Sequence, residues 1–84
     1  MNVANQHLKV LAQSIANWEQ NGKECSDADL AEAYQSDVRD LWKVHAAMKK
    51  GDFALAAKIA FDLDTIVREQ IPNSVYELLE RELN

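Results

Sequence analysis

The chain has 84 residues, enough for one domain spanning 1–84 with a small hydrophobic core. Its 14 acidic and 9 basic residues give a formal charge of −5, which disfavours direct binding to the phosphate backbone of a nucleic acid. The single cysteine excludes an internal disulfide, and the sequence contains no run of about 20 apolar residues that would span a membrane.

The first element predicted is a helix over residues 3–20. Apolar side chains recur there every three or four residues, so they share one helical face. They are Ala4, Leu8, Leu11, Ile15 and Trp18. The pair Asn21-Gly22 follows, and we expect Gly22 to end the helix in a left-handed conformation.

A second helix is predicted over residues 27–50. Ser26 and Asp29 resemble a capping box at its start, and Asp27 favours the positive end of the helix dipole. The predicted apolar stripe contains Leu30, Tyr34, Val38, Leu41, His45 and Met48. Two lysines and Gly51 close the helix, because cations and a following glycine favour helix C-termini.

Residues 53–70 are predicted to form a third helix, capped by Asp52. Its main face comprises Phe53, Ala56, Ile59, Ala60, Leu63, Ile66 and Val67. Because apolar residues extend around most of its circumference, the pattern predicts that this helix is the central one. We expect it to form a central antiparallel hairpin with the 27–50 helix, turning at Gly51.

The last predicted helix covers residues 74–83. Ile71-Pro72 interrupts the preceding helix, since the residue before a proline avoids the helical region. Ser74 and Glu77 match a capping box, and the buried side is expected to contain Val75, Tyr76, Leu79 and Leu83. The chain is therefore predicted to be all-α, a small domain of four helices without a sheet.

The inventory of reactive residues argues against catalysis. Two histidines and one cysteine are too few for a zinc site, and neither histidine is preceded by the Glu-x-x-His pattern of di-metal carboxylate bundles. The two isolated glycines form no phosphate-binding loop. Cys25, with acidic neighbours, is interpreted as an ordinary loop residue. We predict no enzyme activity, no metal and no cofactor.

Six residues are candidates for contacting a partner protein: Trp42, Phe61, Arg68, Asp37, Asp40 and His45. His45 lies in the apolar stripe, so it is either a buried neutral histidine or a pH-sensitive interface position. Arg68 either pairs with Asp64 four residues earlier or anchors a partner or the last helix. Trp42 and Phe61 lie away from the centres of their stripes, so each either covers a second helix or marks a contact surface.

Two local resemblances add expectations. Residues 50–56, Lys-Gly-Asp-Phe-Ala-Leu-Ala, resemble the middle of a tetratricopeptide unit, which implies an antiparallel helical hairpin bent at Gly51. The residues Asn21, Glu24, Ser26, Asp27, Asp29, Leu30, Ala31 and Tyr34, followed by Ile71-Pro72 and Ser74-Val75-Tyr76, resemble the Hha/YmoA family. That resemblance implies a small helical modulator that binds a bacterial nucleoid-structuring protein.

The function favoured by elimination and size is protein binding. We expect a small acidic cytoplasmic regulator or inhibitor, of the kind found among bacterial and phage accessory factors, that occupies a surface of a partner protein. The negative charge favours a partner with a basic surface. A homodimeric structural or assembly factor is the alternative, because Tyr34, Val38, Leu41, His45 and Met48 alternate four and three residues apart, as in a short coiled-coil seam.

Overall fold

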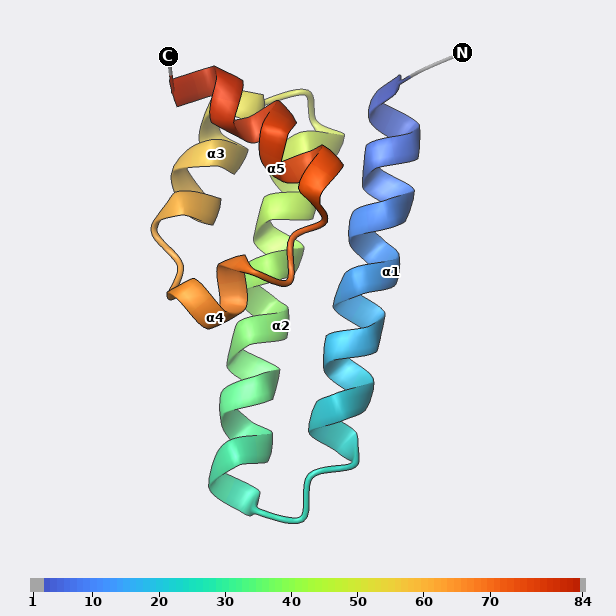
Figure 1. The fold of residues 1–84 in the computed structure, drawn as a ribbon, viewed down its shortest axis with the longest axis vertical. Helices are drawn as coiled ribbons and strands as arrows, with labels where there is room; N and C mark the ends of the chain where they lie inside the picture. The colour runs from blue at the N-terminus through green and yellow to red at the C-terminus, as the bar shows by residue number, and fades with distance from the viewer. Residues whose placement is uncertain (1–2, 84) are drawn as a thin grey trace.

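The computed structural model describes residues 3–83, and every regular element in that range is a helix (Figure 1). The prediction of an all-α domain is therefore confirmed for this part of the chain. Two long helices, α1 (Val3–Lys23) and α2 (Ala28–Lys49), are followed by three short ones, α3 (Phe53–Phe61), α4 (Thr65–Arg68) and α5 (Asn73–Glu80). A final 3₁₀ turn covers Arg81–Leu83.

α2 is the central element. It runs antiparallel to α1 on one side and to α3 on the other, whereas α5 packs against α3 and α1 (Figure 1). The predicted hairpin of the second and third helices is present, and Gly51 at its turn has a φ of 82°. However, the prediction that the third helix is central was wrong. α3 is too short to span the molecule, and Leu55 on its outer face is 45% exposed.

The core is built from the inner faces of all five helices. Its buried residues are Leu11, Ile15, Val38, Leu41, Val44, Ala47, Met48, Ala56, Ala57, Ala60, Val67, Ile71, Val75 and Leu79. Leu11 and Ile15 confirm the predicted face of α1, with Leu8 and Trp18 half-buried beside them; the side chain of Ala4 lies outside the described residues. On α2 the stripe differs from the prediction, because Leu30 is exposed and Val44 and Ala47 are buried.

The first helix does not end at Gly22. It continues to Lys23, and Gly22 is buried without a positive φ. A Cβ built on Gly22 would lie 2.6 Å from the Cβ of Tyr34. Gly22 therefore allows α1 and α2 to approach closely. The local sequence pattern could not distinguish a glycine with this role from one that ends a helix.

The predicted 53–70 helix is broken into α3 and α4. The chain leaves the helix at Asp62 and begins the next at Thr65. Aspartate competes with helical hydrogen bonding and favours helix ends, and two aspartates flank this break. The break also explains why Ile66, assigned to the apolar face, is 64% exposed while its neighbour Val67 is buried.

At two helix starts the cap residue differs from the one predicted. Asp27, not Ser26, caps α2, with its carboxylate accepting from the backbone N–H groups of Asp29 and Leu30. α5 begins at Asn73 with Pro72 at the cap position, so the capping box of Ser74 and Glu77 does not form. Asp52 does cap α3, accepting from the N–H of Leu55 at 3.1 Å, as predicted.

The end of the α1–α2 hairpin that carries its connecting loop extends beyond the other helices. α3 and α5 lie beside the half of the hairpin that is nearer the chain termini, and α4 lies beside its middle (Figure 1). The molecule is elongated, with principal extents of 40, 26 and 19 Å. The loop end of the hairpin therefore has only two helices, without a third layer to cover it.

Candidate functional site

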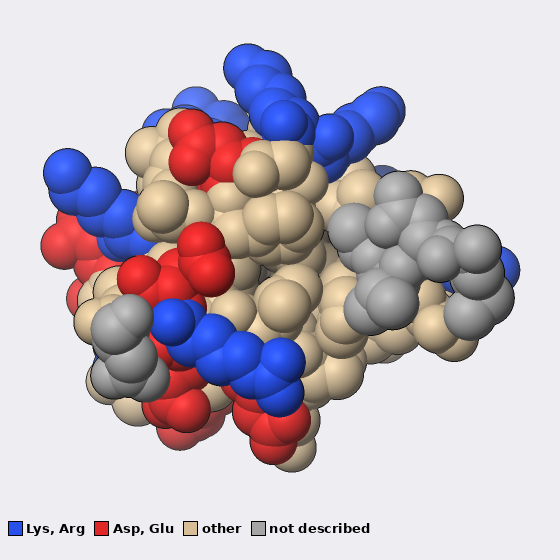
Figure 2. Space-filling view, turned by 90° about the horizontal axis from the view of Figure 1, so that it is seen from above, with Lys and Arg blue, Asp and Glu red and all other residues tan. Residues whose placement is uncertain are grey.

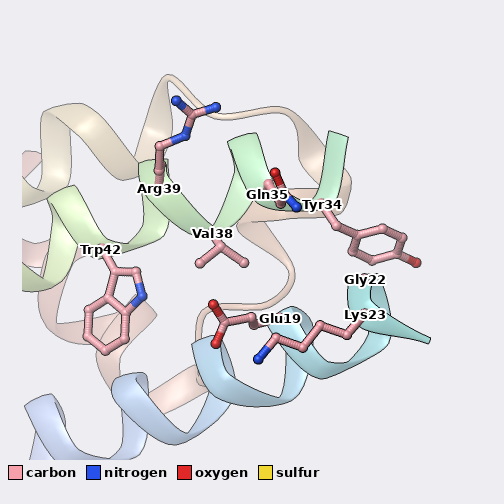
Figure 3. A pocket seen from close by; sticks show the side chains of 8 residues that line it. All are labelled: Glu19, Gly22, Lys23, Tyr34, Gln35, Val38, Arg39 and Trp42. Carbon is pink, nitrogen blue, oxygen red and sulfur yellow. The ribbon is translucent and has the colours of Figure 1, made fainter. Parts of the chain in front are cut away.

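A groove opens along the α1–α2 seam toward this uncovered end, with a volume of about 410 Å³ (Figure 3). α1 contributes Glu19, Gly22 and Lys23, and α2 contributes Tyr34, Gln35, Val38, Arg39 and Trp42. Tyr34, Val38 and Trp42 are spaced four residues apart, so they lie along one side of α2 and form an apolar wall. The exposed polar residues of the groove stand at its edges, and Arg39 points away from α1 (Figure 3).

Trp42 is the most exposed aromatic side chain of this groove, with 40% of its surface accessible. Its ring meets the ring of His45 edge to face, with centroids 4.9 Å apart. Trp18, in contrast, is half-buried: its ring lies 4.6 Å from that of Tyr34, and its indole N–H donates to Asp37 at 3.4 Å. Of the two tryptophans, Trp42 therefore offers the larger free apolar surface.

His45 is half-buried beside the seam, a position between the two alternatives of a buried neutral histidine and an interface residue. Burial lowers the pKa of His45 below 6.5, and the nearby positive charge of Lys49 lowers it further. A hydrogen bond with the backbone of Leu8 acts in the opposite direction, raising the pKa. The net shift favours the neutral imidazole.

Asp37 and Asp40 lie on α2 away from the Trp42 groove. Burial raises the pKa of Asp37 above 3.8, the hydrogen bond from Trp18 lowers it, and the charges of Asp40 and Asp64 raise it. Asp40 pairs with Lys43 at 3.6 Å on the helix surface. These two acids therefore belong to a different side of α2 from Trp42 and His45.

Phe61 and Arg68 form a third group, at the break between α3 and α4. The guanidinium of Arg68 lies 6.0 Å from the centre of the Phe61 ring and donates to the Phe61 carbonyl at 3.4 Å. Phe61 also packs edge to face on Tyr76, with centroids 5.1 Å apart. The geometry thus places Arg68 against Phe61 and Phe61 against α5, in contacts within the fold.

The structure therefore divides the six candidates among three places and adds residues that the sequence reasoning missed. Gly22 had been assigned to a helix end, and Tyr34 to the buried stripe. Glu19, Lys23, Gln35 and Arg39 are ordinary exposed residues whose position beside the seam depends on how α1 and α2 pair. The edge position of Trp42 on its stripe was the one local signal for this groove.

Charge is concentrated at the same end of the molecule. Residues 19–37 contain six acidic residues and one lysine, a net charge of −5 that equals the formal charge of the whole chain. The opposite end, seen in Figure 2, carries basic and acidic side chains together around its rim. The groove thus opens at the end of the molecule that holds most of the negative charge, and its own charged lining residues are Glu19, Lys23 and Arg39.

Within residues 3–83, no three histidine, cysteine, aspartate or glutamate side chains are placed to hold a metal ion. None of the described helices is long and apolar enough to cross a membrane. Cys25 is half-buried in the α1–α2 loop, where its thiol lies 3.7 Å from the carbonyl oxygen of Asp27.

The chain matches no protein-family model, and no curated protein or solved structure shows significant similarity to it. The resemblances to the tetratricopeptide unit and to the Hha/YmoA family therefore stay predictions.

Proposed function

We propose that this chain is a protein-binding module, a small acidic regulator or inhibitor that acts by occupying the surface of a partner protein. The observation that carries the proposal is the exposure of Trp42 beside an apolar-walled groove at the acidic end of the hairpin. Tryptophan is enriched among the residues that contribute most to protein interfaces, because it buries a large apolar area with few rotatable bonds.

The groove is suited to receiving side chains of another protein. Its apolar wall extends from Tyr34 to Trp42, a distance of about 12 Å along α2 at 1.5 Å per residue. This length matches about two turns of a helix in a partner protein. Glu19 and Lys23 on α1 supply hydrogen-bonding groups of both signs at the opposite edge, as in the polar rim of an interface.

The surrounding charge indicates the partner's character. Because residues 19–37 carry a net charge of −5, they attract a basic surface and repel an acidic one. The charged residues that line the groove are one acid and two bases, Glu19, Lys23 and Arg39, so the complementary lysines or arginines of the partner would lie farther out, opposite the acidic residues around the groove. The attraction between opposite charges would mainly accelerate association and select the partner. The apolar contacts at Trp42 would set the lifetime of the complex.

A photo-crosslinking amino acid at Gln35, in the source cell, tests this function. We expect a covalent adduct between this chain and a second protein. Gln13 is the matched control, because it is also an exposed glutamine but lies on α1 outside the groove. The adduct should form from position 35 and be at least tenfold weaker from position 13.

Truncation of Trp42 gives the second half of the test. In the chain carrying the crosslinker at position 35, Trp42→Ala should remove most of the adduct. Val10→Ala should retain it, because Val10 is equally exposed, at 40%, but lies outside the groove. Adducts of equal strength from both glutamines, or an adduct that survives Trp42→Ala, would contradict the proposal.

A further inference from the structure

A second groove lies between α2 and α3 and has a volume of about 580 Å³. Its lining residues are Asp40, Lys43, Leu55, Lys58, Ile59, Asp62 and Leu63. None of them lines the Trp42 groove. The function proposed above does not use this surface.

The apolar part of this second groove has a symmetric spacing. Leu55 and Ile59 lie one turn apart on the same side of α3, and Leu63, four residues after Ile59 and just beyond the helix end, lines the same groove. Leu55 is 45% exposed, and Ile59 and Leu63 are half-buried. A two-fold axis through Ile59 would place Leu55 of one copy opposite Leu63 of another and Ile59 opposite itself.

The charged residues of the groove are separated by sign along its length. Because α2 and α3 are antiparallel, Lys43 and Lys58 lie toward the Gly51 turn, while Asp40 and Asp62 lie toward α4. Both walls are therefore positive at one end and negative at the other, and the groove itself is neutral. Rotation by the two-fold axis would bring the lysines of each copy to the aspartates of the other.

We propose that the α2–α3 groove is an isologous dimer interface whose occupant is the same groove of a second copy of this chain. Self-complementary apolar spacing and self-complementary charge are what such an interface requires. Asp40 and Lys43 already form a 3.6 Å pair within α2. A wholly basic or wholly acidic partner would repel one member of that pair, whereas a second copy would place an opposite charge beside each member.

The rest of the molecule is compatible with this pairing. The two-fold axis makes the α3 helices antiparallel, so the loop ends of the two hairpins, with their net charge of −5 each, point away from one another. Trp42 precedes Lys43 by one residue and lies roughly 100° around α2 from it. The Trp42 side chains would therefore lie outside the dimer interface, and Arg39, four residues before Lys43, would stand at the boundary between the two grooves.

Sedimentation equilibrium tests the pairing. We expect the weight-average mass of the unmodified chain to rise from 9.5 kDa toward twice that value as its concentration increases. Leu55→Lys should hold the mass at the monomer value. Val10→Lys is the control, because Val10 is similarly exposed on α1 outside this groove, and it should leave the association unchanged.

A charge exchange tests the two-fold arrangement itself. The double variant Lys43→Glu, Lys58→Glu makes the groove wholly acidic, and Asp40→Lys, Asp62→Lys makes it wholly basic. Each alone should be monomeric, with helical circular dichroism retained, and the equimolar mixture should form a 1:1 heterodimer. A chain that stays at 9.5 kDa up to about 1 mM, or variants that fail to combine when mixed, would overturn the proposal.

Discussion

Gly22 shows how a single residue sets the distance between the two longest helices. Its Cα faces Tyr34 so closely that no side chain fits between them. The ring of Tyr34 then rests on Trp18, and Trp18 reaches Asp37, so one glycine permits a chain of contacts across the seam. The apolar wall of the Trp42 groove begins at this point of close approach.

We therefore expect Gly22→Ala to destabilise the protein, although alanine normally favours a helix more than glycine does. The added Cβ would lie 2.6 Å from that of Tyr34, so α1 and α2 must separate. Overpacking of this kind raises the free energy of the native state by about 1–3 kcal/mol. Urea unfolding measures the loss. Asn21→Ala, one residue earlier and exposed, should be close to neutral.

Asp37 gives a prediction with a definite pH dependence. Its pKa is raised in the folded chain, mainly by burial, so the folded state holds its proton more tightly than the unfolded state does. Ionisation of Asp37 therefore lowers the stability as the pH rises through and above 3.8. Asp37→Asn keeps an acceptor for Trp18 but removes the charge, so it should be more stable than the parent chain at pH 7.

Thermal unfolding of both chains between pH 3 and pH 7 measures this difference. The advantage of Asp37→Asn should shrink as the pH falls and Asp37 becomes protonated in the parent chain. Glu32→Gln, an exposed change on the same helix, should show no comparable advantage. A less stable Asp37→Asn protein at pH 7 would mean that the charged hydrogen bond with Trp18 outweighs burial and the neighbouring carboxylates.

For the candidate residues, the sequence indicated which side chains lie off the regular apolar stripes, but not which residues they contact in the fold. Trp42 stood at the edge of a periodic stripe, which left open whether it covers a second helix or marks a contact surface, and in the structure it is 40% exposed. The contact of Arg68 with Phe61 could not be foreseen, because it requires the chain to break between them. Periodicity assumes a continuous helix, so it predicts contacts poorly across a break.

At the scale of single elements, helix starts are where local sequence was most ambiguous. Ser26 and Asp27 are adjacent and both are favoured cap residues. The structure places the hydrogen bonds on Asp27. The same ambiguity affected α5, where Pro72, with its fixed φ, takes the cap position ahead of Ser74.

The cap of α2 can be tested with two neighbouring substitutions. Asp27→Ala removes the acceptor for two backbone N–H groups and should lower the free energy of unfolding by about 1 kcal/mol. Ser26→Ala, which removes the residue first expected to cap the helix, should change it by less than half as much. Chemical denaturation compares the two variants, and the reverse order would restore Ser26 as the cap.

The break between α3 and α4 has a cause that lies partly outside the local sequence. Asp62 and Asp64 disfavour a helix at this point, but apolar residues continue to recur at helical spacing beyond them, as far as Val67. A continuous helix of that length would extend along α2 toward the hairpin loop. The observed turn instead returns the chain across the core, where Val67 and Ile71 are buried. Tertiary packing thus decides the outcome where propensity and periodicity disagree.

For the whole molecule, the helical spacing of apolar residues and the positions of glycine and proline predicted the class of fold and the turn at Gly51. They did not predict which helix is central, because that depends on length: α2 has 22 residues and α3 has nine. They also did not predict the grooves, since each is formed by residues from two helices that are neighbours only after folding. The stripe proposed as a coiled-coil seam is largely used within the monomer, where Val38, Leu41 and Met48 are buried.

The uneven placement of charge gives this elongated body a permanent electric dipole along its long axis. Near a cationic macromolecule, such a dipole exerts a torque that turns the loop end forward before any atoms touch. At physiological ionic strength this orienting effect reaches only about 8 Å, so it acts in the last moments of an encounter. Added salt should therefore reduce the fraction of productive collisions while leaving the contacts made afterwards nearly unchanged.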